Sequence, residues 1–440
     1  MCNCEFRGYP LFRQRPMPYV KYFKDFKEEN RMKKFLALLL ALVMALSLVA
    51  CGETTTPAAD DADAGEESEA PALKIGVVLV GDENEGYTFA HIDGIRKAAA
   101  ACGIADDQIV WFYTIPESEV CYDKCIDCVE QGCNLVITNS YGHQTFCQMA
   151  AEECPDVQFV AMTGDTAMKS GLDNFHNAFN QTYQSRYVSG IVAGMKLKEM
   201  MDEGLVTDPY IGYVGAFPYA EVVSGYTGFY LGIKSIVPEA HMDVQYTNSW
   251  FNIQDEGKAA EALMARGCCI IGQHADSTGA PKAVQTAKDN GKNVYSVGYN
   301  VDMLLAAPTA ALTSSTNDWS VYYTYLFKTM LAGEVPATDW SEGYESGAVC
   351  ITKLGPEVAE GTAEAVAAAE AAIKDGSLHV FDTSTFTVGG EEVTSAFTFD
   401  SDGDWTNDTN EGIVDGYYHE SEYISAPSFG LRIDGITELN

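Results

Sequence analysis

Residues 73–101 read LKIGVVLVGDENEGYTFAHIDGIRKAAAA, and this stretch decides the fold. The apolar run 73–80 predicts a buried strand, residues 81–86 form a polar loop, and residues 88–101 have the composition of a helix. The same succession recurs up to residue 180, with strands predicted at 108–113, 134–138, 158–162 and 174–180 and helices at 117–131 and 143–153. Strands that alternate with helices in this way indicate a parallel sheet with right-handed crossovers.

A second set of strands and helices follows the first. It begins with a helix at 183–201 and continues with strands predicted at 210–214, 241–246, 268–272 and 293–297 and helices at 221–236, 255–266 and 279–290. Two such sets predict an α/β protein with two doubly wound parallel-sheet lobes joined by a hinge. No GxGxxG follows the first strand and no GxxxxGK[ST] occurs, so the sequence does not favour binding of nicotinamide cofactors or P-loop nucleotides.

Composition and pattern together divide the chain into segments. We expect an over-extended start or leader at 1–31, a lipoprotein signal at 32–51 and a disordered tether at 52–72. The first lobe covers 73–182 and is completed by part of the hinge segment, and the second lobe covers 183–299. The hinge crossings follow at 300–340 and an α+β extension at 341–440. In the extension, a helix is predicted over 359–375, ending at Gly376. Runs 378–388 and 392–399 around Gly389-Gly390 predict a hairpin.

The segment before residue 52 has the features of an export signal. Met32-Lys33-Lys34 precedes an apolar run that ends with small residues at Ala50. This run is shorter than the roughly 20 apolar residues of a transmembrane helix. Leu48-Val49-Ala50-Cys51 resembles a bacterial lipobox, in which the cysteine is lipidated and becomes the mature N-terminus. We therefore expect a lipid anchor on Cys51 at the extracytoplasmic face of a bacterial membrane; an ordinary signal peptide or a short anchor is the alternative.

The charge of the chain restricts its partners. The net charge is −36, and the acidic excess lies after residue 51, because basic residues outnumber acidic ones before it. Such a body repels nucleic acids and anionic membrane surfaces, so no nucleic-acid partner is predicted. The same charge disfavours strongly acidic ligands and favours a neutral or cationic one.

Two motifs suggest metal sites, and both have a simpler interpretation. Cys121, Cys125, Cys128 and Cys133 form C-x3-C-x2-C-x4-C, but the first three share one face of the helix at 117–131, which favours burial as small apolar side chains over a zinc or iron–sulfur site. Residues 400–411 place five acidic residues and Thr406 at calcium-loop positions, but Trp405 stands where such loops need glycine. An Asp/Gly-rich hairpin turn is the favoured interpretation, and we predict no bound metal or cofactor.

Candidate binding residues are found by where the strands end. In open parallel sheets, ligands bind beyond the carboxyl ends of the strands. The residues there and at the hinge are mainly aromatics and amides: Tyr87, Asn139, Ser140, Tyr141, Phe217, Trp250, His274, Asp276, Asn300 and Trp319. A planar heterocycle needs rings against its faces and polar groups around its edge. Several have alternative roles: Tyr87, Trp250, Phe217 or Trp319 could be packing residues, His274 could hold its loop, and Asp276 could cap a helix.

Several segments together resemble the basic membrane protein family, the purine nucleoside receptors of ABC importers, which have a type I periplasmic binding protein fold. The resemblance covers about residues 73–435, in family order, and is carried by 86–94, 138–142, 211–218, 247–251, 272–277 and 317–319. It is strongest toward the subgroup that takes purine bases such as adenine, although much of that subgroup has Trp where this chain has Tyr87. It implies that Tyr87 and Trp250 stack on the purine while Asn139, Asp276 and Asn300 contact its edge. Asn84 and Asn300 stand where the nucleoside-binding branch has acidic residues, which favours a base over a nucleoside.

The implied activity is capture rather than catalysis. No GxSxG, HExxH or paired-carboxylate arrangement is present in the sequence, so no enzyme is predicted. The resemblance implies that the lobes close on a purine base or nucleoside and that the closed form docks on permease subunits driven by a separate ATPase. A small-molecule sensor or signalling receptor with the same fold, or a transport receptor for a sugar or another neutral ligand, remains the alternative.

Overall fold

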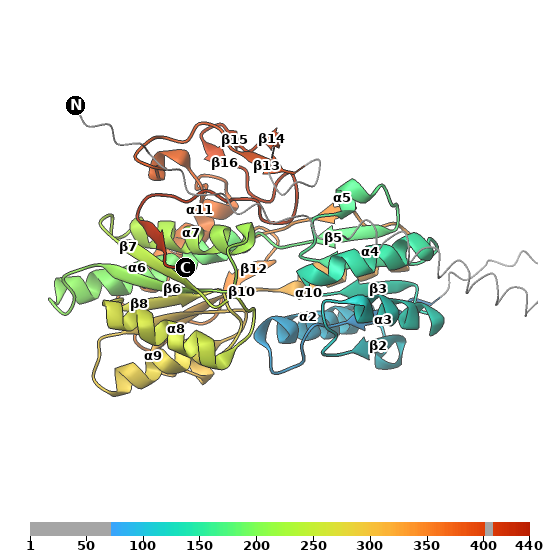
Figure 1. Cartoon of the computed structure of the whole chain (residues 1–440), viewed down its shortest axis with the longest axis horizontal. Coiled ribbons are helices and arrows are strands. Elements are labelled where there is room, and N and C mark those ends of the chain that lie inside the picture. Colours follow the sequence, from blue (N-terminus) through green and yellow to red (C-terminus); the bar gives the residue numbers. More distant parts are fainter. Residues whose placement is uncertain (1–71, 401–407) are drawn as a thin grey trace, which may run out of the picture. The chain divides into compact units, whose positions relative to one another are not determined.

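The computed structural model of the 440-residue chain describes residues 72–400 and 408–440 (Figure 1). The predicted signal, Cys51 and almost all of the tether lie outside the described residues, as do positions 401–407 of the Asp-rich loop. The described residues belong to one unit, Glu69–Asn440. Within them, no helix combines the length and the apolar composition that crossing a membrane requires.

The first lobe is built on a six-stranded sheet in the order β11-β5-β4-β3-β1-β2, with every pairing parallel. Its strands are β1 (Ile75–Val78), β2 (Ile109–Phe112), β3 (Leu135–Thr138), β4 (Gln158–Met162), β5 (Phe175–Ala178) and β11 (Asp339–Trp340). Its connecting helices are α2 (Gly86–Cys102), α3 (Glu119–Glu130), α4 (Gln144–Glu153) and α5 (Ala167–Ser170). The central strands are fully buried, as their continuous apolar composition predicts.

The second lobe is built on a seven-stranded sheet in the order β12-β10-β9-β8-β6-β7-β17. Its strands are β6 (Tyr210–Gly215), β7 (His241–Tyr246), β8 (Ile270–Gln273), β9 (Tyr295–Tyr299), β10 (Ala311–Asn317), β12 (Val349–Ile351) and β17 (Ile436–Glu438), and its helices are α6 (Thr182–Asp202), α7 (Ala220–Lys234), α8 (Ile253–Arg266) and α9 (Gly279–Asp289). All pairings are parallel except β10 with β12. The predicted α/β architecture with two parallel sheets is therefore confirmed.

The chain passes between the two sheets three times. It leaves the first sheet after β5, returns from β10 into α10 (Trp319–Leu331), and leaves again from β11 toward β12. The apolar side of α10 packs in the core of the first lobe against α2. Residues 300–340 are thus divided, with β10 in the second sheet and α10 and β11 in the first lobe.

The extension differs from its predicted pattern. Helix α11 (Thr362–Lys374) is followed by Gly376 in the left-handed region, as expected of a helix end. Around Gly389-Gly390, however, only Val388 and Glu391 pair, as an isolated bridge. Apolar side chains of the expected first strand are instead buried in the core shared with the second lobe, so tertiary packing overrides the alternating pattern. The hairpin is formed by β13 (Phe397–Phe399) and β14 (Thr409–Glu411), and β15 (Ile413–Val414) pairs with β16 (Tyr417–Tyr418).

The cysteine-rich segment forms the predicted helix, α3. Cys121, Cys125 and Cys128 are fully buried on one face, and Cys133 is buried just beyond the helix end. Gly76 of β1 faces them so closely that a Cβ there would lie 2.4 Å from Cys128 Sγ. In the part of the chain that is described, no group of three or more His, Cys, Asp or Glu side chains is arranged to hold a metal ion. Helix packing accounts for these cysteines.

Candidate functional site

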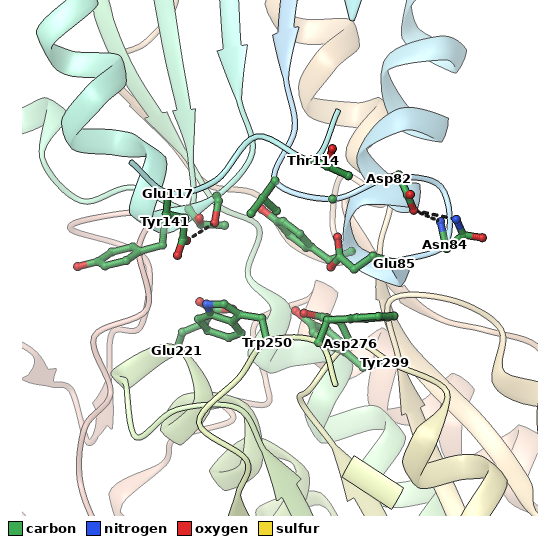
Figure 2. Close-up of a pocket in the computed structure, with 16 residues that line it drawn as sticks. Asp82, Asn84, Glu85, Thr114, Glu117, Tyr141, Glu221, Trp250, Asp276 and Tyr299 are labelled. Carbon is green, nitrogen blue, oxygen red and sulfur yellow. Dashed lines mark hydrogen bonds between the residues drawn. The ribbon is translucent and has the colours of Figure 1, made fainter. Parts of the chain in front are cut away.

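A cavity of about 290 Å³ lies between the two lobes, at the carboxyl ends of strands from both sheets (Figure 2). The first lobe contributes the loop after β1 and residues that follow β2, β3 and β4. The second lobe contributes Glu221 at the start of α7, Trp250 and Phe251 after β7, Asp276 after β8 and Tyr299 at the end of β9. Parallel strands bring these segments to one edge of each sheet, which is the position predicted from the strand ends.

Five predicted site residues line this cavity: Tyr87, Ser140, Tyr141, Trp250 and Asp276. The Tyr87 hydroxyl donates a 2.5 Å hydrogen bond to the Asn139 carbonyl. The backbone N–H of Asp276 donates to the Trp250 carbonyl at 2.8 Å, which ties together the loops after β7 and β8. Figure 2 shows Trp250, Glu221, Asp276 and Tyr299 on one side of the cavity and Tyr141, Glu117, Glu85 and Asp82 on the other. Aromatic and polar side chains from both lobes therefore face the same space.

Two predicted site residues of the first lobe lie behind the cavity wall. The Asn139 side chain accepts from Val80 N at 2.8 Å and donates to Thr88 Oγ1 at 3.2 Å, so its amide is used to hold the loop after β1. Trp319 is buried and stacks on His91, with 4.3 Å between ring centroids. Its position at the start of α10, which packs against α2, directs it into the core rather than the cavity.

Three predicted site residues of the second lobe also lie outside the wall. Phe217 packs edge-on against Trp250, at 5.2 Å between centroids, and so supports that ring. His274 is buried with its Nε2 3.3 Å from a carboxylate oxygen of Glu221. Asn300 has a left-handed backbone, with φ of 61°, and its amide donates to Asp276 Oδ1 at 2.6 Å. Asp276 does not cap α9, because Ser277 Oγ accepts from Gly279 N there.

Several residues that the strand-end reasoning missed are acidic. Asp82, Glu85, Glu117 and Glu221 line the cavity together with Asp276, and none of the lining residues is Lys, Arg or His. The sequence argument for a bare base rested on Asn84 and Asn300 standing in place of acidic residues. In the structure Asp82 and Glu85 flank Asn84 in the same loop and Asp276 bonds to Asn300, so carboxyl groups lie beside both positions. Asp82 and Glu85 follow the first predicted strand, so the signal was present in the sequence.

Burial raises the affinity of Glu221 and Asp276 for protons. Burial raises the pKa of Glu221 to about 7, although the charge of Arg186 opposes the shift. Burial also raises the pKa of Asp276 well above its usual range, with the carboxyl groups of Glu85, Glu256 and Glu221 adding to the effect. The site therefore favours ligands that bring hydrogen-bond donors or positive charge.

Arg186 is a residue that the sequence placed away from the strand ends. Helix α6 carries its side chain behind the cavity wall, where it is buried and its Nη1 donates to the Gln273 carbonyl at the end of β8 at 2.6 Å. Its guanidinium lies 3.6 Å from the centroid of the Tyr299 ring. This cation–π contact supports the face of the ring that is turned away from the cavity.

Two threonines in the cavity wall adopt an unusual backbone conformation. Thr114 and Thr163 have φ values of 54° and 62°, in the left-handed region that β-branched residues avoid. Such conformations cost about 1–3 kcal/mol each and are maintained by the surrounding structure. Both lie in the first lobe, so they indicate that the loops of this half of the site are held in a fixed shape.

A family of substrate-binding proteins and two curated proteins resemble this chain. Residues 74–378 match the family model Bmp, described as ABC transporter substrate-binding protein PnrA-like. A purine-binding protein of Brucella abortus is 30% identical over 315 residues, which cover 70% of this chain and 83% of that protein. A protein described as an ABC transporter glucose-binding protein, from Haloferax volcanii, is 30% identical over 338 residues, covering 76% and 80% respectively.

A solved structure of a solute-binding protein has a similar fold. A solute-binding protein of an ABC transporter system from Conexibacter woesei superposes with a TM-score of 0.56 at 20% identity, over 70% of this chain and 98% of that one. The predicted two-lobe binding-protein fold is thus confirmed, and the family consists of solute-binding proteins rather than enzymes. From the family match over most of its length, this chain belongs to the Bmp family of PnrA-like substrate-binding proteins of ABC transporters.

Proposed function

We propose that this protein is a lipid-anchored extracytoplasmic receptor that captures a purine, as base or nucleoside, for an ABC importer. The cavity between the lobes is the observation that carries this proposal. Aromatic rings reach it from both lobes, with Tyr87 and Tyr141 on one side and Trp250 and Tyr299 on the other. Offset stacking between such rings stabilises a planar heterocycle. The purine-binding relative from Brucella abortus supports the same ligand class.

The size and the charge of the cavity restrict the classes of ligand that it can bind. Its volume of about 290 Å³ is at the lower end of the range of roughly 300–1,000 Å³ for small-molecule sites. Ionised carboxylates only accept hydrogen bonds, which suits the ring N–H and amino groups of a purine. Phosphorylated ligands are disfavoured, because five carboxyl groups line the cavity and no lining residue is Lys or Arg.

The choice between base and nucleoside rests on the acidic residues. The sequence argument for a bare base assumed that acids were missing beside Asn84 and Asn300. In the structure Asp82, Glu85 and Asp276 occupy these surroundings, and carboxylates are suitable acceptors for ribose hydroxyls. The proposal therefore covers both purine bases and their nucleosides.

Capture would proceed by closure of the lobes. A ligand that contacts Tyr87 in one lobe and Trp250 in the other binds the closed arrangement better than an open one, and this difference in affinity shifts the population toward closure. The three crossings between the sheets are the segments able to act as the hinge. The closed form would then present a new surface to permease subunits, which a separate ATPase drives.

A thermal-shift series tests the ligand class. Adenine, guanine, hypoxanthine and their nucleosides are added to the protein, with nucleotides and D-glucose for comparison. At 100 times its Kd, a ligand stabilises the folded state by about 2.7 kcal/mol. We expect purine bases or nucleosides to raise the melting temperature and nucleotides to leave it unchanged; stabilisation by sugars alone would contradict the proposal.

Replacing Trp250 tests whether the cavity is the site. Trp250→Ala removes a stacking ring, and we expect it to abolish the purine-induced shift. Trp111→Ala is the matched control, because Trp111 is a half-buried tryptophan of β2 that does not line the cavity. The control should lower the melting temperature without ligand yet retain the shift. An unchanged shift in Trp250→Ala would remove Trp250 from the site.

A sugar receptor is the second candidate. The glucose-binding relative from Haloferax volcanii favours it, since its identity to this chain equals that of the purine-binding relative. Aromatic faces and carboxylate acceptors also suit sugar rings and their hydroxyls. In the thermal-shift series, D-glucose would then stabilise the protein and the purines would not.

The lipid anchor is proposed from the sequence between Lys33 and Cys51. Mass spectrometry of the mature protein should find an N-terminal Cys51 that carries acyl chains. Cys51→Ala should release the protein from the membrane fraction. Retention of Cys51→Ala in the membrane would contradict this part of the proposal.

A further inference from the structure

Carboxyl groups from both lobes meet at one end of the cavity. Glu85 precedes α2 in the first lobe, while Asp276 and Glu256 belong to the second lobe. Gly86 lies so near the second lobe that a Cβ on it would be 3.2 Å from the Asp276 carbonyl oxygen. The lobes therefore touch beside these groups. Glu85 and Asp276 are only 8% and 6% exposed, and Glu256 is fully buried.

The hydrogen-bond partners of the three carboxyl groups bring no full charge. Glu85 Oε2 accepts from Thr88 N at 3.1 Å, and Asp276 Oδ1 accepts from the Asn300 amide. Glu256 accepts from two backbone N–H groups, those of residues 252 and 277, at 2.9 and 3.1 Å. These bonds favour the ionised form of each carboxyl group. Because the donors are neutral, they do not cancel the negative charge of a carboxyl group that is ionised.

The other titratable groups around the cluster do not neutralise it. Asp82 and Glu117 come from loops of the first lobe and Glu221 from α7, and all three are carboxyl groups that cannot bring positive charge. Burial lowers the pKa of His274 well below its usual range, so its ring is uncharged. Tyr87 and Tyr299 are also uncharged, because burial raises the pKa of each phenol above its usual range.

One buried cation, Arg186, faces the cluster from α6. Its charge lowers the pKa of Asp276, although less than burial raises it. Its Nη1 is bonded to the Gln273 carbonyl and its guanidinium is stacked on Tyr299. Among the described residues, the charge of Arg186 is therefore opposed by a larger number of carboxyl groups.

Removing water from such a cluster makes ionisation costly. Burial raises the pKa of Glu256 to about 7, and it raises the pKa of Glu85 and of Asp276 as well. When the lobes separate, water reaches Glu85 and Asp276 and the two lobes no longer repel each other. Closure therefore raises the affinity of the cluster for protons.

We propose that closure of the cleft on an uncharged ligand takes up protons into the Glu85–Asp276–Glu256 cluster, so that ligand binding strengthens as pH falls. The inference rests on the proposed capture function, but it requires only that the ligand be uncharged. Its sign follows from carboxyl groups that bind protons more tightly in the closed form. The affinity for the ligand is highest at pH values below the ordinary glutamate pKa of 4.5, and it falls as the pH rises toward about 7.

Titration calorimetry of the full-length protein measures the uptake directly. Adenine, hypoxanthine and D-glucose are the uncharged probes, each titrated at pH 6 in phosphate and in Bis-Tris, whose ionisation enthalpies differ. We expect the apparent enthalpies to differ by an amount that corresponds to uptake of up to one proton per responding group. The Kd should increase up to tenfold per pH unit between pH 5.5 and 6.5 for each proton taken up.

Variants assign the protons to the cluster. Asp276→Asn and Glu85→Gln each keep an oxygen acceptor, and both should reduce the number of protons taken up. Glu420→Gln is the matched control, because Glu420 is a 1% exposed carboxyl of the extension that lies outside the cavity wall. Its uptake should equal that of the unsubstituted protein.

The possible outcomes separate the two proposals. Binding of D-glucose but not purines, with unequal enthalpies, would reject the purine ligand and keep the proton uptake. Binding of a purine with equal enthalpies in both buffers would overturn the uptake and keep the ligand. Binding of only cationic probes would overturn the uptake as well, because the ligand itself would then bring the charge.

Discussion

Glu221 shows how a single side chain determines the electrostatics of the cavity. It lies at the start of α7, its carboxylate is 3.3 Å from His274 Nε2, and its side chain is 20% exposed. Because His274 is uncharged, this contact is a hydrogen bond rather than an ion pair. The carboxyl group is therefore held in a poorly solvated position without a cationic partner in direct contact, and its ionisation opposes folding.

Replacing Glu221 tests how much its ionisation destabilises the folded protein. Burial raises the pKa of Glu221 to about 7 in the folded protein, so its contribution to stability is fully present below about pH 4.5 and is lost as pH rises through about 7. We expect Glu221→Gln to stabilise the ligand-free protein by about 1–3 kcal/mol at pH 8, and to have no stabilising effect at pH 4.5. Urea denaturation at the two pH values measures the difference, and equal effects at both would contradict the assignment.

The N-terminus of α2 is the element that brings the lobes together. Glu85 caps this helix by accepting from Thr88 N, and the next residue, Gly86, approaches the loop of Asp276. A Cβ at this position would lie 3.2 Å from the carbonyl oxygen, which is tighter than most packed contacts, so the loop of Asp276 would have to shift slightly. The start of α2 is thus a point of close contact between the two lobes.

A methyl group at position 86 should therefore impair closure selectively. We expect Gly86→Ala to weaken ligand binding by roughly fivefold, equivalent to about 1 kcal/mol, because the added Cβ meets the second lobe. Gly257→Ala is the control, since a Cβ on this helical glycine of α8 would meet its nearest atom at an ordinary 3.5 Å. Calorimetric Kd values for both variants measure the effect. Equal Kd values would show that Gly86 does not limit closure.

At the scale of the whole molecule, the extension joins the two lobes. Ser425 donates two hydrogen bonds of 2.5 Å, from its N–H and its hydroxyl, to Asp339 in β11 of the first lobe. Farther along, β17 pairs with β7 at the edge of the second sheet. Phe381 and Phe429 stack at 4.1 Å within the core shared with the second lobe. Residues after 378 lie beyond the family match, so this strap is a feature of the chain outside that match.

Removing the attachment to the first lobe tests the strap. We expect Asp339→Ala to destabilise the protein by about 1.5–3 kcal/mol, because two hydrogen bonds to a carboxyl group are lost at a partly buried site. Asp382→Ala is the matched control, since Asp382 accepts the same pair of bonds from Ser384 within an exposed turn. The control should cost less than about 1 kcal/mol in urea denaturation. Similar decreases in the free energy of unfolding of both variants would show that the contact with the extension stabilises the protein no more than a bond within a turn does.

The pattern of apolar residues within each segment was enough to predict the strands of the two sheets. Strand 158–162 coincides with β4 because a continuous apolar run between helices has no other way to be buried. The hairpin at 378–399 failed because Phe381 and Phe386 are buried in a core whose other members are distant in sequence. No local periodicity reveals such a partner.

The sequence alone determined where the cavity of this protein would lie, because parallel strands that alternate with helices bring their carboxyl ends to one edge. It also identified Tyr87, Ser140, Tyr141, Trp250 and Asp276, which line the cavity. Only the tertiary structure decided which side chains at those ends face the cavity. Asn139 turns to the backbone of the loop after β1, Asn300 turns to Asp276, and helices bring Glu221 to the wall and Arg186 behind it. The physical reason is that a side chain's direction depends on hydrogen bonds and packing with residues far away in the chain, which the pattern of its own segment does not contain.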